Sequence, residues 1–202
     1  AFFMPNLIGG LVLGYIWQFI YNKALVQVAP MFDPSLISQG DTALWGLIVV
    51  VTWQYAGYIM MIYIAALQNV PQDLVEASKI DGANAVQRLR HIVFPLIAQA
   101  FTIAMFLTLT TSFKQFDTVV SLTQGGPSLI LENLPLWVRS MFNITISPIV
   151  QSTQLVASDI YETAFTNRLQ GVGQAKAIVF FFVLLLVSFV QVRINQKREV
   201  EL

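Results

Sequence analysis

The chain has 202 residues, of which 56% are apolar and 11% are charged, with 11 basic and 11 acidic side chains and no formal net charge. Soluble domains carry about 25% charged residues, so this composition excludes a small soluble globule and a disordered tail, and the balanced charge gives no field to attract nucleic acid. The sequence has no cysteine and one histidine, which removes thiolate chemistry and the usual Ser-His or Cys-His nucleophile pairs.

Long uncharged stretches predict membrane-spanning helices, because one crossing of a bilayer needs about 20 mostly apolar residues. In chain order the candidate spans are about 2–21, 43–67, 92–113 and 177–192. Pro5, Gly9 and Gly10 interrupt the first span, and Lys176 and Arg193 flank the last one. The expected fold is therefore all-α, a polytopic transmembrane helical bundle with four spans in this sequence.

Lysine and arginine are concentrated between spans two and three and after span four. Residues 69–90 and 193–202 contain six of them in 32 residues, whereas 23–42 and 114–176 contain five in 83. Because cytoplasmic loops hold the excess of positive charge, we expect the loop after the second span and the C-terminus to face the cytoplasm.

The loop between spans two and three, residues 69–91, has the local signals of two short helices. Pro71 suits a first helical position, Gly82 suits a left-handed turn, and Asn84 can cap the second helix. Leu74, Ala77 and Ser78 would form a narrow stripe on the first helix. This stripe either enters a groove on another protein or rests on the chain's own helices.

The same loop contains a spaced motif. Glu76-Ala77-Ser78, three residues, Gly82, nine residues and Ile92-Val93-Phe94-Pro95 resemble the EAA motif of binding-protein-dependent ABC importer permeases. That pattern reads EAA, three residues, G, nine residues and I-x-L-P, so Ser78 and Phe94 are the two departures. Both replace a residue with another small or apolar one.

The resemblance extends to the maltose and multiple-sugar permease branch over most of the chain, at the segments 2–22, 52–71, 112–127 and 163–178. It implies a MetI-like ABC importer permease fold, with 1–202 as a partial transmembrane domain showing four of a probable six spans. Residues 128–151 are an extra external segment relative to this branch, and no role is assigned to them.

The resemblance also implies a division of labour in a bacterial plasma (inner) membrane. The expected partners are a second homologous permease subunit, two ATP-binding cassette ATPase subunits, an extracellular or periplasmic solute-binding protein and a sugar. The residues expected to couple to the ATPases are Glu76, Ala77, Ser78, Asp81 and Gly82. We expect no enzyme activity, metal or cofactor in this chain. The sequence has no G-x-x-x-x-G-K-[ST] loop to hold nucleotide phosphates, so ATP would be bound by the partner subunits.

Polar and aromatic residues inside spans indicate a substrate path, since polar groups there usually face a cavity. The second span carries Trp53, Gln54, Tyr55 and Tyr58, and the outer end of the third carries Ser112, Phe113, Lys114 and Asp117. Motif resemblance adds Gly10. The alternative is that the aromatic residues only pack and that Lys114 and Asp117 form a structural ion pair.

Other functions remain open from the residues alone. An ion-gradient-driven secondary transporter or channel is also a polytopic bundle with polar groups inside its spans, and a permease for a non-sugar solute would share the same motifs. A membrane scaffold is a further possibility. An intramembrane enzyme is disfavoured because the carboxylates lie in loops and at interfaces.

Overall fold

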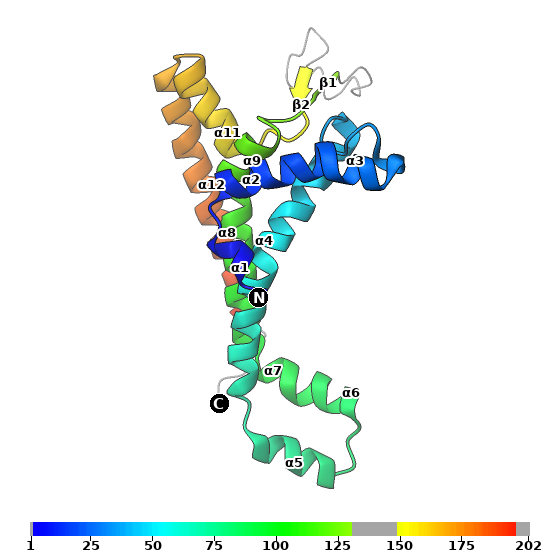
Figure 1. Ribbon diagram of the computed structural model, residues 1–202. Helices are drawn as coiled ribbons and strands as arrows, with labels where there is room; N and C mark the ends of the chain where they lie inside the picture. The colour runs from blue at the N-terminus through cyan, green and yellow to red at the C-terminus, as the bar shows by residue number, and fades with distance from the viewer. Residues whose placement is uncertain (1, 131–148, 197–202) are drawn as a thin grey trace.

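The computed structural model describes residues 2–130 and 149–196 (Figure 1). From the N-terminus the chain forms α1 (Met4–Leu7), α2 (Gly10–Phe19), η1 (Ile20–Ala24), α3 (Leu25–Val28), η2 (Pro30–Phe32) and α4 (Gly40–Gln68). It continues with α5 (Gln72–Ile80), α6 (Ala85–Arg88), η3 (Leu89–Val93), α7 (Phe94–Leu96), α8 (Ala98–Phe113) and α9 (Asp117–Leu122). The remaining elements are β1 (Ser128–Ile130), β2 (Ile149–Gln151), α11 (Val156–Tyr161), η4 (Glu162–Thr166) and α12 (Gln170–Gln196).

Two helices of the described residues, α4 and α12, are each long and apolar enough to cross a membrane. They contain the predicted spans 43–67 and 177–192. The third predicted span is bent, because the helical stretch that ends at Leu96 and α8 meet at 65°. Pro95 lies at this bend and has no backbone N–H to continue the helix, which is a usual cause of a kink.

The first predicted span, 2–21, is not one continuous helix. Ile8 and Gly9 are extended, with ψ of 126° and 141°, and they separate α1 from the ten-residue α2. After this break the helix continues from Gly10 through η1 and α3 to Val28. Figure 1 shows α2 and α3 lying across the upper end of α4 instead of alongside it. The break therefore redirects the chain at this point.

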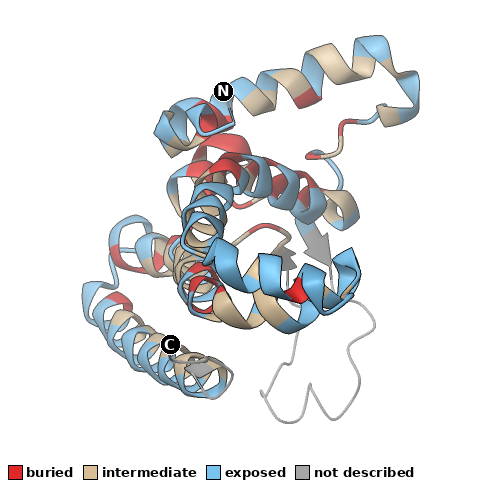
Figure 2. Ribbon diagram, turned by 90° about the horizontal axis from the view of Figure 1, so that it is seen from below, coloured by how far each residue is buried: buried red, intermediate tan, exposed pale blue. Residues whose placement is uncertain are grey.

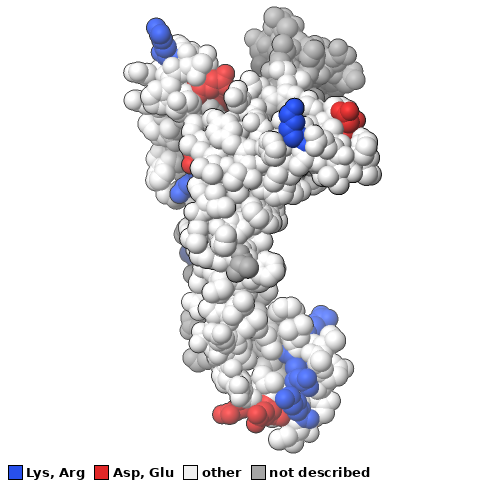
Figure 3. Space-filling model, viewed as in Figure 1, with Lys and Arg blue, Asp and Glu red and all other residues white. Residues whose placement is uncertain are grey.

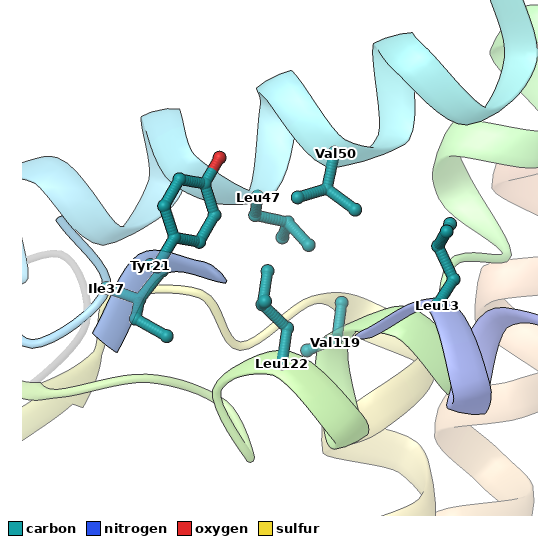
Figure 4. Close-up of a cluster of buried hydrophobic side chains, with 7 residues drawn as sticks. All are labelled: Leu13, Tyr21, Ile37, Leu47, Val50, Val119 and Leu122. Carbon is teal, nitrogen blue, oxygen red and sulfur yellow. The ribbon is translucent and has the colours of Figure 1, made fainter. Parts of the chain in front are cut away.

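The core lies where α2, α4 and α9 meet, and Figure 4 shows its side chains pointing toward one another. Its buried members are Leu13, Tyr21, Ile37, Leu47, Val50, Val119 and Leu122. The Tyr21 hydroxyl donates a hydrogen bond to the Gly46 carbonyl at 3.0 Å, so this buried polar group is satisfied. The core thus joins residues more than 100 positions apart.

The long helix α12 contributes little to this core and keeps most of its apolar side chains exposed (Figure 2). Phe182 and Leu186, for example, are 62% and 63% exposed. A contiguous exposed apolar surface of this kind is typical of a face that meets lipid or another protein. The high apolar content of the chain therefore comes from its exposed surface as much as from its core.

The end of the molecule opposite α5 holds the antiparallel pair β1–β2, with Ser128 paired to Gln151, and the short helix α11. This small ribbon is an addition to the all-α architecture. The strands lie at the two ends of the predicted extra segment 128–151, and residues 131–148 of that segment lie outside the described residues.

The last helix, α12, begins at Gln170, before the predicted span, and its first turns contact α11 and η4. The Lys176 ammonium donates hydrogen bonds to Asp159 Oδ2 at 2.7 Å and to Thr163 Oγ1 at 2.8 Å. A Cβ at Gly173 would lie 2.6 Å from the Ala164 Cβ, so the helices approach closely there. Lys176 is therefore a tie between elements as well as a charge at the end of a span.

Candidate functional site

A polar cavity of about 210 Å³, called the inner cavity here, lies where α2, α4, α8 and α9 meet. Its lining residues are Gly10, Gln54, Tyr55, Thr111, Lys114, Gln115, Phe116, Asp117 and Thr118. Four residues predicted for the substrate path, Gly10, Tyr55, Lys114 and Asp117, are thus brought together from three separate segments. Amide, hydroxyl and charged groups beside aromatic rings can hydrogen-bond and stack on a polyhydroxylated molecule.

Gln54 is the buried polar side chain of this cavity that lies within the long helix α4. It is 5% exposed, its Nε2 lies 3.5 Å from the Ile8 carbonyl oxygen, and its Oε1 has no partner among the described residues. A buried amide oxygen without a partner is costly. Gln54 therefore places a buried amide, with one unpaired acceptor, beside the inner cavity.

Gly10 lies in the wall of the inner cavity, where α2 and α9 approach closely. Together with Gly14 it faces α9, and a Cβ at Gly10 would lie 2.9 Å from the Asp117 Cβ. The Ser121 hydroxyl donates to the Gly10 carbonyl at 3.2 Å across this contact. Small residues allow two helices to approach in this way, so Gly10 shapes the cavity through its lack of a side chain.

The other predicted path residues lie outside the lining of the inner cavity. Trp53 packs edge-on against Trp17, with ring centroids 5.5 Å apart, and Tyr58 lies 6.4 Å from Phe3. Phe113 packs near Phe180 of α12 at 6.2 Å. The structure gives these three rings packing partners.

Ser112 is exposed, and Lys114 and Asp117 make no ion pair within the described residues. Four lining residues, Thr111, Gln115, Phe116 and Thr118, were not among those predicted from the sequence. The available signal was their position within three residues of Lys114 or Asp117.

A second candidate site is the loop hairpin, residues 72–96, which comprises α5 and the helices that return to α8. Figure 1 shows α5 held apart from the long helices at the lower end of the molecule. Gly82 has φ of +80°, as predicted for a left-handed turn, and the Ala83 N–H donates to the Ser78 carbonyl at 2.9 Å. Asn84 caps α6 with a complete capping box that includes Gln87.

The predicted details of α5 differ by one residue at its start. Pro71 is the N-cap residue and α5 begins at Gln72. Of the predicted stripe, Ser78 is buried and donates to the Val75 carbonyl at 2.7 Å, whereas Leu74 and Ala77 remain exposed. The stripe therefore rests on its own loop only in part.

Grooves flank α5 on two sides. One of about 590 Å³ is lined by Glu76 and Lys79, and one of about 400 Å³ is lined by Leu74, Ala77 and Asp81. Figure 3 shows acidic side chains gathered along the lower edge of the loop hairpin and basic ones beside them. An exposed helix with separated charges and open apolar positions is suited to docking on a partner.

Metal-binding chemistry finds no support in residues 2–130 and 149–196, where no group of three or more His, Asp or Glu side chains is placed to hold an ion. The two candidate sites are the inner cavity and the exposed surface of α5.

Comparison with known proteins gives a family match over nearly the whole chain. The profile described as "Binding-protein-dependent transport system inner membrane component" matches residues 2–200. A probable starch degradation products transport system permease protein of Thermoanaerobacterium thermosulfurigenes is 43% identical over 206 residues, which cover 100% of this chain and 63% of the relative. The chain thus spans less than two thirds of that relative.

Two solved structures share the fold. One is a bacterial ABC transporter involved in the import of the acidic polysaccharide alginate, with a TM-score of 0.69, 15% identity, and coverage of 97% of this chain and 63% of the other. The second is the bacterial alginate transporter in complex with an alginate pentasaccharide-bound periplasmic protein, with a TM-score of 0.61, 17% identity, and coverage of 96% and 61%.

Proposed function

Because the chain belongs to the family of binding-protein-dependent transport system inner membrane components, we propose that it is a permease subunit of an ATP-driven carbohydrate importer. The observation that carries this proposal is the placement of α5, an exposed helix held apart from the long apolar helices, while the inner cavity lies among them. The 43% identity to a permease for starch degradation products supports a saccharide as cargo.

The translocation path, in this proposal, passes through the inner cavity. Gln54 supplies an unsatisfied acceptor and Tyr55 an aromatic ring, while Lys114 and Asp117 stand at its rim. A sugar has hydroxyls that hydrogen-bond to such groups and C–H faces that pack on aromatic rings. Trp53, Tyr58, Ser112 and Phe113 flank this path.

In this proposal the loop hairpin couples ATP binding and hydrolysis in the ATPase subunits to movement of this chain. We place α5 in a cleft of an ATPase subunit, with Glu76, Ala77, Ser78 and Asp81 at the contact and Gly82 making the turn that follows. Closure of the ATPase pair on ATP would shift α5 as a rigid body, and the bend at Pro95 would pass that movement to α8.

The complete transporter, in this proposal, also contains a second permease subunit, two ATPase subunits and an external solute-binding protein. This chain supplies the path, hydrolyses no ATP and needs no cofactor of its own. A neighbouring solved transporter was crystallised with a saccharide-bound periplasmic protein, which supports a partner of that kind.

The proposed orientation places the loop hairpin and the C-terminus in the cytoplasm of a bacterium, with the chain passing several times through the inner membrane. Lys79, Arg88 and Arg90 lie on the loop hairpin, where positive charge favours the cytoplasmic side. Figure 1 shows α12 running toward the end of the molecule that carries α5. Placing the loop hairpin and the C-terminus on the same side of the membrane is therefore consistent with the charge distribution.

The test uses the assembled transporter in proteoliposomes, with its solute-binding protein and a panel that includes glucose, maltose and maltotriose. We expect one or more of these saccharides to stimulate ATP hydrolysis and to accumulate only when ATP is supplied. Accumulation that persists without ATP and stops when an ion gradient is collapsed would identify a secondary transporter. ATP-dependent uptake confined to non-sugar solutes would overturn the carbohydrate assignment.

A further inference from the structure

A second cavity, called the outer cavity here, lies at the end of the molecule opposite α5. It has a volume of about 390 Å³ and is bounded by the end of α9, the turn that follows it, the end of β2, and α11 with η4. Ligand-binding pockets commonly measure about 300–1,000 Å³, so the outer cavity reaches that range whereas the inner cavity, at about 210 Å³, falls below it.

The lining of the outer cavity is rich in amides and aromatic rings. Gln124, Gln151, Gln154 and Glu162 supply donors and acceptors, and Gln154 Nε2 donates to Glu162 Oε2 at 2.6 Å. The Tyr161 and Phe116 rings, both in this lining, have centroids 5.0 Å apart and planes tilted by 54°. Amides and carboxylates pair with hydroxyls in both directions, and an aromatic face packs against a sugar ring.

The wall beside these amides is held in a fixed shape by the turn after α9. Gln124 and Gly125 have φ of 54° and 97°, and a Cβ at Gly125 would overlap the side-chain oxygen of Gln151. Thr153 is fully buried, its N–H donates to the Gly125 carbonyl at 2.8 Å, and its hydroxyl lies 2.6 Å from that of Thr123. Fixed donors lose little freedom when a ligand binds.

Phe116 is common to the walls of the outer and the inner cavity, so the two cavities are neighbours. We propose that the outer cavity is a saccharide-binding site at which a sugar unit is held before it enters the inner cavity. This inference rests on the proposed function, since it takes the cargo to be a saccharide. It assigns binding roles to Gln154, Glu162 and Tyr161, which no motif of the sequence indicated.

The first experiment measures binding directly by protecting a single cysteine. The sequence contains no cysteine, so Thr166→Cys, at the exposed rim of the outer cavity, adds one thiol to this chain within the complete transporter. We expect maltotriose to slow maleimide labelling of this thiol at least threefold. Gln27→Cys, on exposed α3, is the matched control, and its labelling rate should not change.

The second experiment removes the side-chain groups proposed to bind the sugar, in the Thr166→Cys background. Gln154→Ala and Tyr161→Ala should each raise the maltotriose concentration that gives half-protection by about fivefold, which corresponds to the loss of one hydrogen bond or ring contact. Gln27→Ala should leave it unchanged. Tyr161→Phe keeps the ring and should retain most of the protection, which separates lost stacking from a folding defect.

The outcomes distinguish this inference from the proposed function. Normal ATP-dependent maltotriose uptake with no protection of the Thr166→Cys thiol would overturn the outer site and leave the importer standing. Protection that Gln154→Ala and Tyr161→Ala do not weaken would also overturn it. Protection in a transporter that takes up no saccharide would support the site and contradict the proposed function.

Discussion

The helices of the loop hairpin and of the N-terminal segment, residues 2–24, are both interrupted, but the contacts that fix the two interruptions differ in range. In the loop hairpin, Gly82 and Asn84 set the turn and the cap through bonds to residues within five positions. In the N-terminal segment, Gly10 and Gly14 meet α9, more than 100 positions away. The comparison teaches that local signals suffice for the loop, whereas long-range contacts decide the path of the first segment.

The strongest way to test this comparison is to fill the long-range contact. Gly14→Val would push a side chain into Ser121 and Leu122 of α9, and we expect it to lower stability by about 3 kcal/mol. Gly9→Val is the matched control, because nothing lies within 4 Å of a Cβ there, and it should change stability by less than about 0.5 kcal/mol. The stability of both variants is measured by denaturing the purified transporter and following how much of this chain stays in the complex. Equal effects would contradict a specific contact.

The next largest effect is expected at the turn of the loop hairpin. Gly82→Val places a β-branched residue at φ of +80°, where it costs about 1–2 kcal/mol locally, although the surrounding space is open. We expect saccharide uptake to fall more than tenfold while membrane insertion stays intact. Gly82→Asn, which tolerates the left-handed conformation, should keep most of the uptake. Full transport by Gly82→Val would rule out a coupling role for this turn.

A smaller effect is expected from the cap of α6. Asn84→Ala removes the acceptor for the Gln87 N–H and should destabilise α6 by about 1 kcal/mol. Asn84→Asp keeps an acceptor at the cap and serves as the control. Hydrogen exchange at residues 85–88 reports the change, and an unaltered rate in Asn84→Ala would show that tertiary packing, not the cap, holds this helix.

The smallest effect sharpens the assignment of the inner cavity. Tyr55→Ala removes a ring from the cavity lining and should reduce saccharide uptake about threefold to fivefold, which is less than 1 kcal/mol. Tyr58→Ala removes a ring that packs near Phe3 and should affect uptake less. Both are measured at equal amounts of assembled transporter. A greater loss of uptake in Tyr58→Ala would move the path away from the inner cavity.

Prediction from the sequence succeeded where the signal was local or very long. The spans at 43–67 and 177–192 appear inside α4 and α12, because an uncharged stretch of that length has few alternatives to a helix. The span at 2–21 was wrong as a continuous helix, because the extended residues Ile8 and Gly9 and the contact of Gly57 with the Phe2 backbone turn the chain. Such contacts leave no periodic signal in the sequence.

The predicted path residues show the same limit. The sequence named Tyr55 and Tyr58 together because both are aromatic, but only Tyr55 lines the inner cavity. Gln115 and Phe116 were missed because their burial depends on the turn between α8 and α9. Tyr161 gave no signal in the sequence because the ring it packs against, Phe116, lies 45 positions earlier in the chain.

The sparse charges of the sequence already determined a great deal about this protein. They marked the spans, and the spacing of Glu76, Gly82 and Pro95 in the charged loop indicated the family that the profile match confirms. The tertiary structure alone decided which polar residues share a cavity, where the first segment turns, and that Phe116 lies between two cavities. The physical reason is range: charge, caps and hydropathy act through neighbours in the sequence, whereas cavities and glycine contacts arise only when distant helices pack.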